Sequence, residues 1–331
     1  MPFRGHDGQQ LAHLEDPLAR FFELEAAFDA ERGFMGDHVP LRLAAAKLVL
    51  SPGDAVEIAT QTRAAAEQLR KHLSFISDIM PALQLLLAAV LLERGDQPEP
   101  FLAEVERARP LMRAAKLRRS EVYEVVSILA LRIRNQLQPI TEEQVARLAE
   151  IHAQMKRHHW LLTGPEDYPA CAFLVSQRDR TPEEIGKRAN QIYEGLREQA
   201  KLWRGDPLQT ASNMLALSSL EPAELVERFR LLAVAFGQAG VRIRQGEYDE
   251  VAVLCFLARP SERIVETVTS YAHEIREKLR WTDRATAFAL ATNLAFVRLV
   301  GNDPELGALA DAKMLLDMQT IVEARQAAAA T

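Results

Sequence analysis

The chain has few of the features that mark membrane proteins or disulfide-rich proteins. Its 331 residues include only two cysteines, Cys171 and Cys255, which both lie in apolar stretches and are predicted to be reduced core thiols. The most apolar segment, residues 81–92, is shorter than the roughly 20 residues that cross a bilayer. No apolar secretory signal follows Met1, so we expect a cytoplasmic protein without a membrane partner.

Motifs for catalysis are also missing. The sequence has no glycine-rich phosphate loop, nucleophile elbow, zinc-spaced cysteine pair or dinucleotide fingerprint. This excludes the enzyme classes that depend on those motifs and leaves catalysis by scattered residues open. With a net charge of −6 the chain has no overall positive field. Its densest basic region, residues 113–134, also contains Glu121 and Glu124, so nucleic acid is not an expected partner.

The sequence does contain a unit of roughly forty residues that occurs seven times. Each unit combines an amphipathic helix, a short turn that ends in an acidic residue, and a second, more apolar helix. The first helices carry apolar residues at helical spacing, for example Val145, Leu148 and Ile151. The second helices are apolar on nearly all sides, as in residues 82–92, so we expect them to form an inner layer.

Patterns typical of strands and β-hairpins are absent, so the chain is predicted to be all-α. We expect seven helical hairpins plus a C-terminal helix, arranged as an open α-solenoid or as a closed α/α ring. The predicted organisation is a flexible N-terminal arm (1–15), a helical-hairpin repeat domain (16–302), and a C-terminal capping helix with a frayed tail (303–331).

The acidic turns have a structural explanation. A Ser, Thr or Asp before a helix caps a free backbone N–H group and contributes about 1 kcal/mol, and a first-turn carboxylate meets the positive end of the helix dipole. Capping therefore accounts for most turns, including Trp203–Asp206 and Trp281–Asp283. If the units stack regularly, the same carboxylates form a row that could hold a hard cation such as Mg²⁺ or Ca²⁺.

The fourth turn is longer than the others. Residues 155–169 bring two histidines, two carboxylates, a hydroxyl and a phenol into one connection. Such a cluster could bind a metal or supply a general acid and base, although no known ligand spacing is satisfied. The alternative is a turn that Gly164 and Pro165 shape and that Trp160 and Tyr168 pack.

The candidate binding residues come from this turn and from the next unit. Gln209 is one of several polar residues in an apolar second helix, where a buried amide either bonds locally or lines a cavity. If the units stack in order, it lies beside the fourth turn. The candidate binding residues are His159, Thr163, Glu166, Asp167, Tyr168, Asp206 and Gln209. The candidate metal ligands are His159, Glu166 and Asp167.

Two blocks of this region carry a pattern that resembles a bacterial protein family. Met-Lys-x-x-His matches residues 155–159, Leu-Thr-Gly matches 162–164, and an acidic-Asp-Tyr-Pro run matches 166–170. A second block covers residues 192–196 and 205–209. The pattern is similar to that of the proteins grouped as domain of unknown function 4003, and residues 157–158 and 160–161 depart from it.

The resemblance implies a helical bacterial protein without an established activity. It draws attention to five of the candidate residues without giving them roles: His159, Thr163, Asp167, Tyr168 and Gln209.

Two functions are compatible with the sequence. The first is a non-enzymatic binding or scaffold protein whose concave surface holds a peptide, a protein or a small molecule. The second is a metal-dependent enzyme or small-ligand binder with a site at the N-terminal ends of the inner helices, around His159, Glu166, Asp167 and Asp206. Apart from a divalent metal in the second case, no cofactor is expected.

Overall fold

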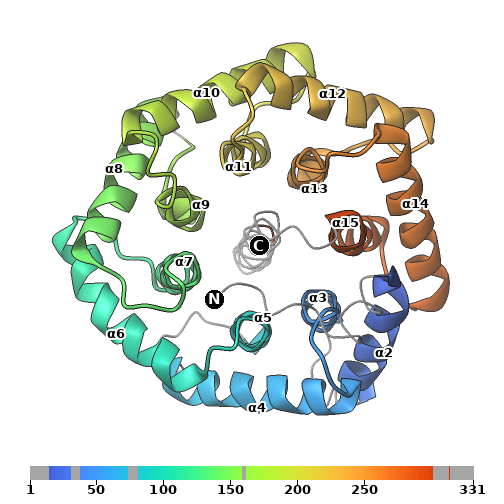
Figure 1. Ribbon diagram of the computed structural model, residues 1–331, viewed down its shortest axis with the longest axis horizontal. Coiled ribbons are helices and arrows are strands. Elements are labelled where there is room, and N and C mark those ends of the chain that lie inside the picture. The colour runs from blue at the N-terminus through green and yellow to red at the C-terminus, as the bar shows by residue number, and fades with distance from the viewer. Residues whose placement is uncertain (1–14, 31–37, 74–80, 159–161, 301–312, 314–331) are drawn as a thin grey trace, which may run out of the picture.

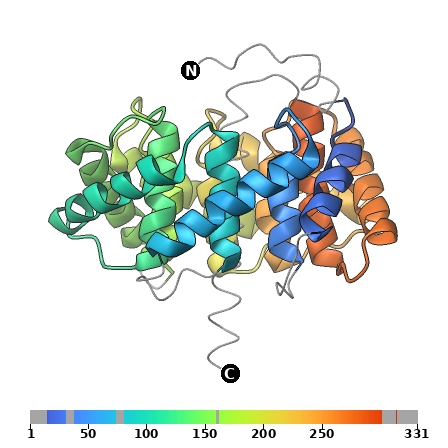
Figure 2. The same cartoon turned by 90° about the horizontal axis from the view of Figure 1, so that it is seen from below.

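The computed structural model describes residues 15–30, 38–73, 81–158, 162–300 and 313. All regular secondary structure in these ranges is helical, which confirms the all-α prediction. Along the chain the helices alternate between an outer and an inner layer, and both layers run around a ring (Figure 1). From the side, the ring is one layer of helices in height (Figure 2).

The outer helices are amphipathic, because each needs to bury only the side that faces the inner layer. In α10, for example, Ile185, Ile192 and Leu196 are buried, and both ends of the helix carry charged residues. The outer helices are α2 (Pro17–Ala30), α4 (Ala55–Leu73), α6 (Pro98–Ala114), α8 (Glu142–His158), α10 (Pro182–Gln199), α12 (Pro222–Gln238) and α14 (Ser261–Lys278).

The inner helices are covered on several sides, as their apolar composition predicts. Every residue of α9 is buried. The inner helices are α3 (Val39–Lys47), α5 (Pro81–Glu93), α7 (Glu121–Arg134), α9 (Tyr168–Leu174), α11 (Asp206–Leu215), α13 (Tyr248–Leu254) and α15 (Arg284–Val300). Two short 3-10 helices, η1 (Pro165–Asp167) and η2 (Gln245–Glu247), lead directly into α9 and α13.

Contacts between the last and the first helices close the ring. Helix α15 packs against both α2 and α3. Arg42 of α3 donates a hydrogen bond from Nη2 to the carbonyl of Arg280 at 2.8 Å. The Lys278 ammonium lies 4.5 Å from the centre of the Phe22 ring. Of the two arrangements that the sequence allowed, the described helices form the closed one.

Arginines of the outer helices bind the loops at which the inner helices end. Arg188 of α10 donates to the carbonyls of Ser218 and Leu220, which follow α11. Carbonyls in such loops have no helical partner, so they need donors from elsewhere, and a guanidinium group offers several N–H groups. Equivalent bonds run from Arg20 to Gly53, Arg107 to Ile140, Arg147 to Val175, Gln177 and Arg180, and Arg228 to Cys255.

The predicted terminal segments lie outside the described residues, apart from Glu15 and Lys313. Lys313 is fully buried against α13, with its ammonium 2.9 Å from Glu250 Oε1 and 3.3 Å from Asp249 Oδ2. Both cysteines are buried and unpaired, which confirms the prediction of reduced core thiols. None of the described helices is long and apolar enough to cross a membrane.

Candidate functional site

The described turns that lead from outer to inner helices lie at one end of the ring (Figure 2). We call this end the turn face, and it consists of residues 115–120, 162–167, 200–205, 239–247 and 279–283. Tyrosines connect two pairs of adjacent turns: the Tyr168 hydroxyl accepts from the Arg118 backbone N–H at 2.9 Å, and the Tyr248 hydroxyl accepts from that of Trp203 at 3.3 Å. The site predicted from the sequence therefore lies at one end of the molecule, among neighbouring turns.

Three of the predicted residues form one buried cluster. Gln209 donates from Nε2 to Asp167 Oδ1 at 2.9 Å and to Thr163 Oγ1 at 3.1 Å. Asn213, one helical turn further along α11, donates to the same Asp167 oxygen at 3.2 Å. The backbone N–H of Gly164 donates to Asp167 Oδ2 at 3.1 Å. The cluster ties the fourth turn to the next inner helix, as the stacking of units predicts.

The Asp167 carboxyl is in surroundings that disfavour its charge. Only 6% of Asp167 is exposed, and all of its hydrogen-bond donors are neutral. Burial raises the pKa of Asp167 to about 7; the Glu166 and Asp206 charges act in the same direction, against the hydrogen bonds from Gly164 and Gln209. The carboxyl therefore exchanges its proton near neutral pH. Gln209 Oε1 is also buried and has no hydrogen-bond partner within the described structure.

The sixth turn has the same design as the fourth. Glu247 accepts from the backbone N–H of Arg244 at 2.8 Å, as Asp167 does from Gly164, and a buried tyrosine follows each acid. The difference is the partner on the next inner helix. Arg284 at the start of α15 forms an ion pair with Glu247, whereas Asp167 meets amides. In the sequence, only the fourth turn stands out by its length, so the likeness of the sixth turn is a finding of the structure.

Two predicted residues lie outside the buried cluster. Tyr168 packs edge-on against His152, with ring centres 4.8 Å apart, and its hydroxyl reaches the preceding turn. Asp206 is exposed at the start of α11, close enough for its charge to raise the pKa of Asp167. These two residues contribute packing and charge to the site and do not join its hydrogen-bond network.

The predicted metal ligands remain a prediction. The Glu166 carboxylate lies directly over Gly164, where an added Cβ would come within 2.4 Å of Oε1, so a larger residue at 164 would displace it. His159 lies outside the described residues. Within the described ranges, no group of three or more His, Cys, Asp or Glu residues is arranged to hold a metal ion.

The turn face also exposes large aromatic side chains. Trp203 is 73% exposed and Trp281 is 84% exposed. Trp281 has a φ of 61°, in the left-handed region that bulky residues seldom adopt. The bond from Arg42 to the Arg280 carbonyl and that from Thr282 Oγ1 to the Leu279 carbonyl, at 3.0 Å, hold this turn in place.

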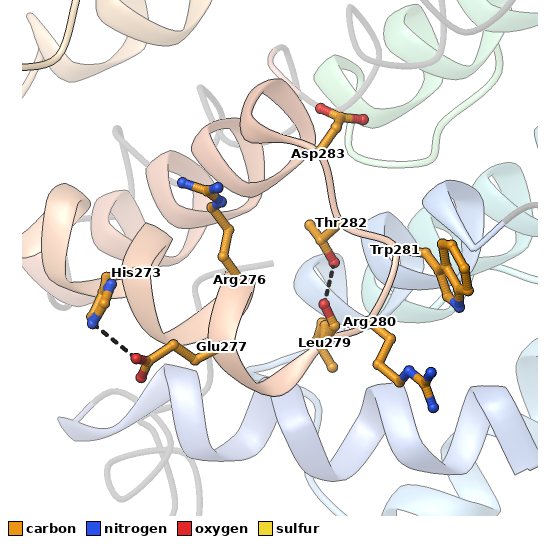
Figure 3. Close-up of a pocket in the computed structure, with 8 residues that line it drawn as sticks. All are labelled: His273, Arg276, Glu277, Leu279, Arg280, Trp281, Thr282 and Asp283. Carbon is orange, nitrogen blue, oxygen red and sulfur yellow. Dashed lines mark hydrogen bonds and ion pairs between the residues drawn. The ribbon is translucent and has the colours of Figure 1, made fainter.

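Two hollows open beside the turns. The first, of about 720 Å³, lies at the junction where the ring closes, and Figure 3 shows Trp281 at one edge and the His273–Glu277 pair at the opposite edge. The second, of about 470 Å³, lies between the end of α6 and the start of α7. Neither hollow is lined by the predicted site residues. The sequence could not predict these hollows, because exposed turn side chains and arginines have the same sequence signal as ordinary surface residues.

The turn face is basic, although the chain as a whole is acidic. Its residues include eight Lys and Arg side chains against four Asp and Glu side chains, or six when Glu121 and Asp206, the acids that directly follow two of the turns, are counted, while the net charge of the chain is −6. The basic residues are Lys116, Arg118, Arg119, Lys201, Arg204, Arg242, Arg244 and Arg280. Cations near the C-terminal ends of the outer helices also suit the helix dipoles, which explains part of this excess.

Comparison with known proteins confirms the family resemblance. The family model described as "Protein of unknown function (DUF4003)" matches residues 59–327. The chain is similar to the uncharacterized protein YeaA of Bacillus subtilis (strain 168), with 24% identity over 189 residues. The match covers 57% of this chain and 55% of the relative, so the chain spans just over half of the length of that protein. No solved structure matches the chain.

Proposed function

We propose that this chain, which belongs to the DUF4003 family of proteins of unknown function, is a non-enzymatic binding protein whose turn face binds an acidic region of a partner protein. One observation carries the proposal. Trp203 and Trp281 are the most exposed large apolar side chains of the described structure, and both stand on the face where basic residues are concentrated.

Exposed tryptophans are unfavourable in water and favourable at an interface. Burial of one such side chain removes on the order of 200 Å² from water, which corresponds to roughly 5 kcal/mol at 25 cal/mol per Å². Tryptophan and arginine are the residues that contribute most to protein interfaces.

The charge pattern favours a protein over a nucleic acid as the partner. Glu166 and Asp283 lie among the basic turn residues, and the exposed Asp206 follows directly. A regular phosphate backbone would bring negative charge against these carboxylates. A protein surface that is mainly acidic and contains some basic residues can pair with both signs.

Selection from a random peptide library displayed on phage tests this proposal. We expect peptides rich in Asp and Glu to be enriched on the wild-type protein and to lose binding to the Trp203→Ser/Trp281→Ser variant. Val234→Ser is the matched control, because Val234 is an exposed apolar residue (46%) on the outer helix α12. Enriched peptides that bind the tryptophan variant as well as the wild type would contradict the proposal, as would selection without acidic enrichment.

A second candidate function is a cation-dependent small-ligand binder or enzyme at the fourth turn. It is favoured by the grouping of Glu166 and Asp206 around the buried Asp167, whose raised pKa would fall if a cation were bound. His159, Thr163, Tyr168 and Gln209 would complete this site. In such an enzyme Asp167 would act as the general acid or base.

Thermal unfolding with Mg²⁺, Ca²⁺ or Zn²⁺ tests this second candidate. Stabilisation by one ion that disappears in Asp167→Asn and persists in Asp283→Asn would support it, since Asp283 is an acid of an ordinary turn. Equal stabilisation of both variants, or none of the wild type, would contradict it.

A further inference from the structure

The hollow between α6 and α7 contains more positive than negative charge. It is lined by Arg109, Pro110, Arg113, Arg119, Glu121 and Glu124 and has a volume of about 470 Å³, within the usual range for small-molecule sites. The adjoining turn is held in place by the bond between the Arg118 backbone and the Tyr168 hydroxyl. One side of the hollow is therefore a turn that a hydrogen bond to the next helix pair holds in place.

Both acids of the hollow already have a basic partner. Glu124 is buried, and its Oε1 accepts from Arg113 and, at 2.7 Å, from the Ser120 backbone N–H. Glu121 accepts from Arg119 at 3.1 Å. Two of the three arginines are thus neutralised by the two carboxylates, and Arg109 is left as the additional positive charge.

Arg109 has two buried N–H groups that donate to no acceptor in the described structure. Its Nε and Nη2 atoms are both without a hydrogen-bond partner, and the nearest carboxylate oxygen, Glu124 Oε2, is 3.8 Å from Nε. Burial lowers the pKa of Arg109, and the charges of Glu124 and Glu121 act in the opposite direction. Buried donors without acceptors are unfavourable, so an acceptor that reached this group would bind favourably.

The same pair of nitrogens binds carboxylates elsewhere in this protein. Arg132 holds Asp96 through Nε at 2.6 Å and Nη2 at 2.9 Å, and Arg107 holds Glu104 through Nε at 2.8 Å and Nη2 at 2.6 Å. In both cases two parallel N–H groups meet two oxygens of one anion, which is the strongest geometry for an arginine. Arg109 has the same pair of nitrogens, but its ion pair with Glu124 is too long for a hydrogen bond, at 3.8 Å from Nε, so neither nitrogen is bonded in this way.

We propose that the hollow is a binding site for a small oxyanion, a carboxylate or a phosphate group, with Arg109 as its principal ligand and Arg119 at its entrance. Arg119 is 75% exposed and can turn toward an incoming anion. Binding requires the Arg109 guanidinium to turn so that Nε and Nη2, which are buried here, face two oxygens of the ligand. The size of the hollow restricts the ligand to a small molecule or to the anionic end of a larger one. This inference does not depend on the proposed partner protein.

Isothermal titration at low ionic strength with inorganic phosphate, and separately with succinate, tests the site and distinguishes the two anions. We expect one of them to bind the wild-type protein, and Arg109→Gln to weaken binding by at least about tenfold. Arg109→Lys keeps the charge without the paired N–H groups, so we expect it to weaken binding nearly as much. Arg263→Gln is the matched control, because Arg263 is an exposed arginine of the outer helix α14 that lies outside the turn face and does not line this hollow, and it should bind as the wild type does.

A further variant keeps the test independent of any folding defect. Arg119→Gln changes an exposed side chain, so the variant should fold normally and bind the anion several-fold more weakly. Unchanged affinity in Arg109→Gln, or binding of neither anion to the wild-type protein at millimolar concentration, would overturn the inference. Loss of the proposed partner interaction in the tryptophan variant, with anion binding retained, would show that the two sites are separate.

Discussion

Gln209 Nε2 donates a hydrogen bond to Asp167 Oδ1 at 2.9 Å, and this contact joins α11 to the turn before α9. Arg284 makes the corresponding connection to Glu247 two helix pairs later. The same position thus carries a carboxyl held by amides in one turn and an ion pair in the other. The fourth turn is therefore the place where the ring contains a buried carboxyl without a positive partner among the described residues.

The stability of the protein should fall as the pH rises toward 7. Asp167 has a folded-state pKa of about 7, raised by burial from its ordinary value of 3.8. Between these values the folded state holds a proton that the unfolded state has lost, so each increase in pH favours unfolding. Below pH 3.8 the Asp167 carboxyl is protonated in both the folded and the unfolded state, and above about pH 7 it is ionised in both. The contribution lost between about pH 5 and about pH 8 is roughly 3 kcal/mol.

Urea unfolding of the wild-type protein and of Asp167→Asn, each at about pH 5 and at about pH 8, measures this contribution. Asn cannot titrate, so the difference in unfolding free energy between the two proteins should change by the stated amount across the window. A difference that stays constant with pH would show that Asp167 is ionised throughout.

Removal of the Gln209 amide should destabilise the fold more than an ordinary surface change does. Gln209→Ala deletes the bonds to Thr163 and Asp167, so that Thr163 Oγ1 loses its donor and Asp167 Oδ1 keeps only the bond from Asn213, at a cost of about 1–3 kcal/mol. Gln199→Ala, at an exposed position of α10, should change stability by less than about 0.5 kcal/mol. Equal effects in the two variants, measured by denaturant unfolding, would argue against the network.

The acidic turn residues should differ in their contribution to stability. Asp283 is exposed and caps α15 by accepting from the Thr286 N–H at 2.9 Å, so Asp283→Ala should cost about 1 kcal/mol. Glu247 is buried and accepts from both Arg284 and the Arg244 N–H, so Glu247→Ala should cost more, about 2–3 kcal/mol, because these charge-assisted hydrogen bonds are lost. Thermal or urea unfolding of the two variants distinguishes these values. Similar costs would mean that both acids act only as caps.

The helical class, the outer and inner layers, and the grouping of Thr163, Asp167 and Gln209 could be predicted from the sequence. The spacing of apolar residues shows which sides of each helix are buried, and this predicts the outer and inner layers. The order of the units along the chain places Gln209 beside the fourth turn. Closure of the ring could not be predicted, because it depends on small rotations between units and on contacts such as Arg42 with Arg280, which are far apart in the chain.

The arginines that hold the inner helix ends and the unpaired donors of Arg109 were also not predictable. An arginine in an amphipathic helix has the same sequence signal whether it binds a loop, an acid or water. The likeness between the fourth and sixth turns was hidden for a similar reason, because Asp167 and Glu247 differ in length and in their partners.

The most direct test of the account is the dissociation constant of a selected acidic peptide for the wild-type protein, for Trp203→Ser/Trp281→Ser and for Val234→Ser. The account predicts that the tryptophan variant binds at least about tenfold more weakly, because truncation of interface tryptophans commonly costs 2 kcal/mol or more. It also predicts that Val234→Ser binds as the wild type does, and that added salt weakens binding by both. An unchanged dissociation constant in the tryptophan variant would contradict the turn face as the binding surface.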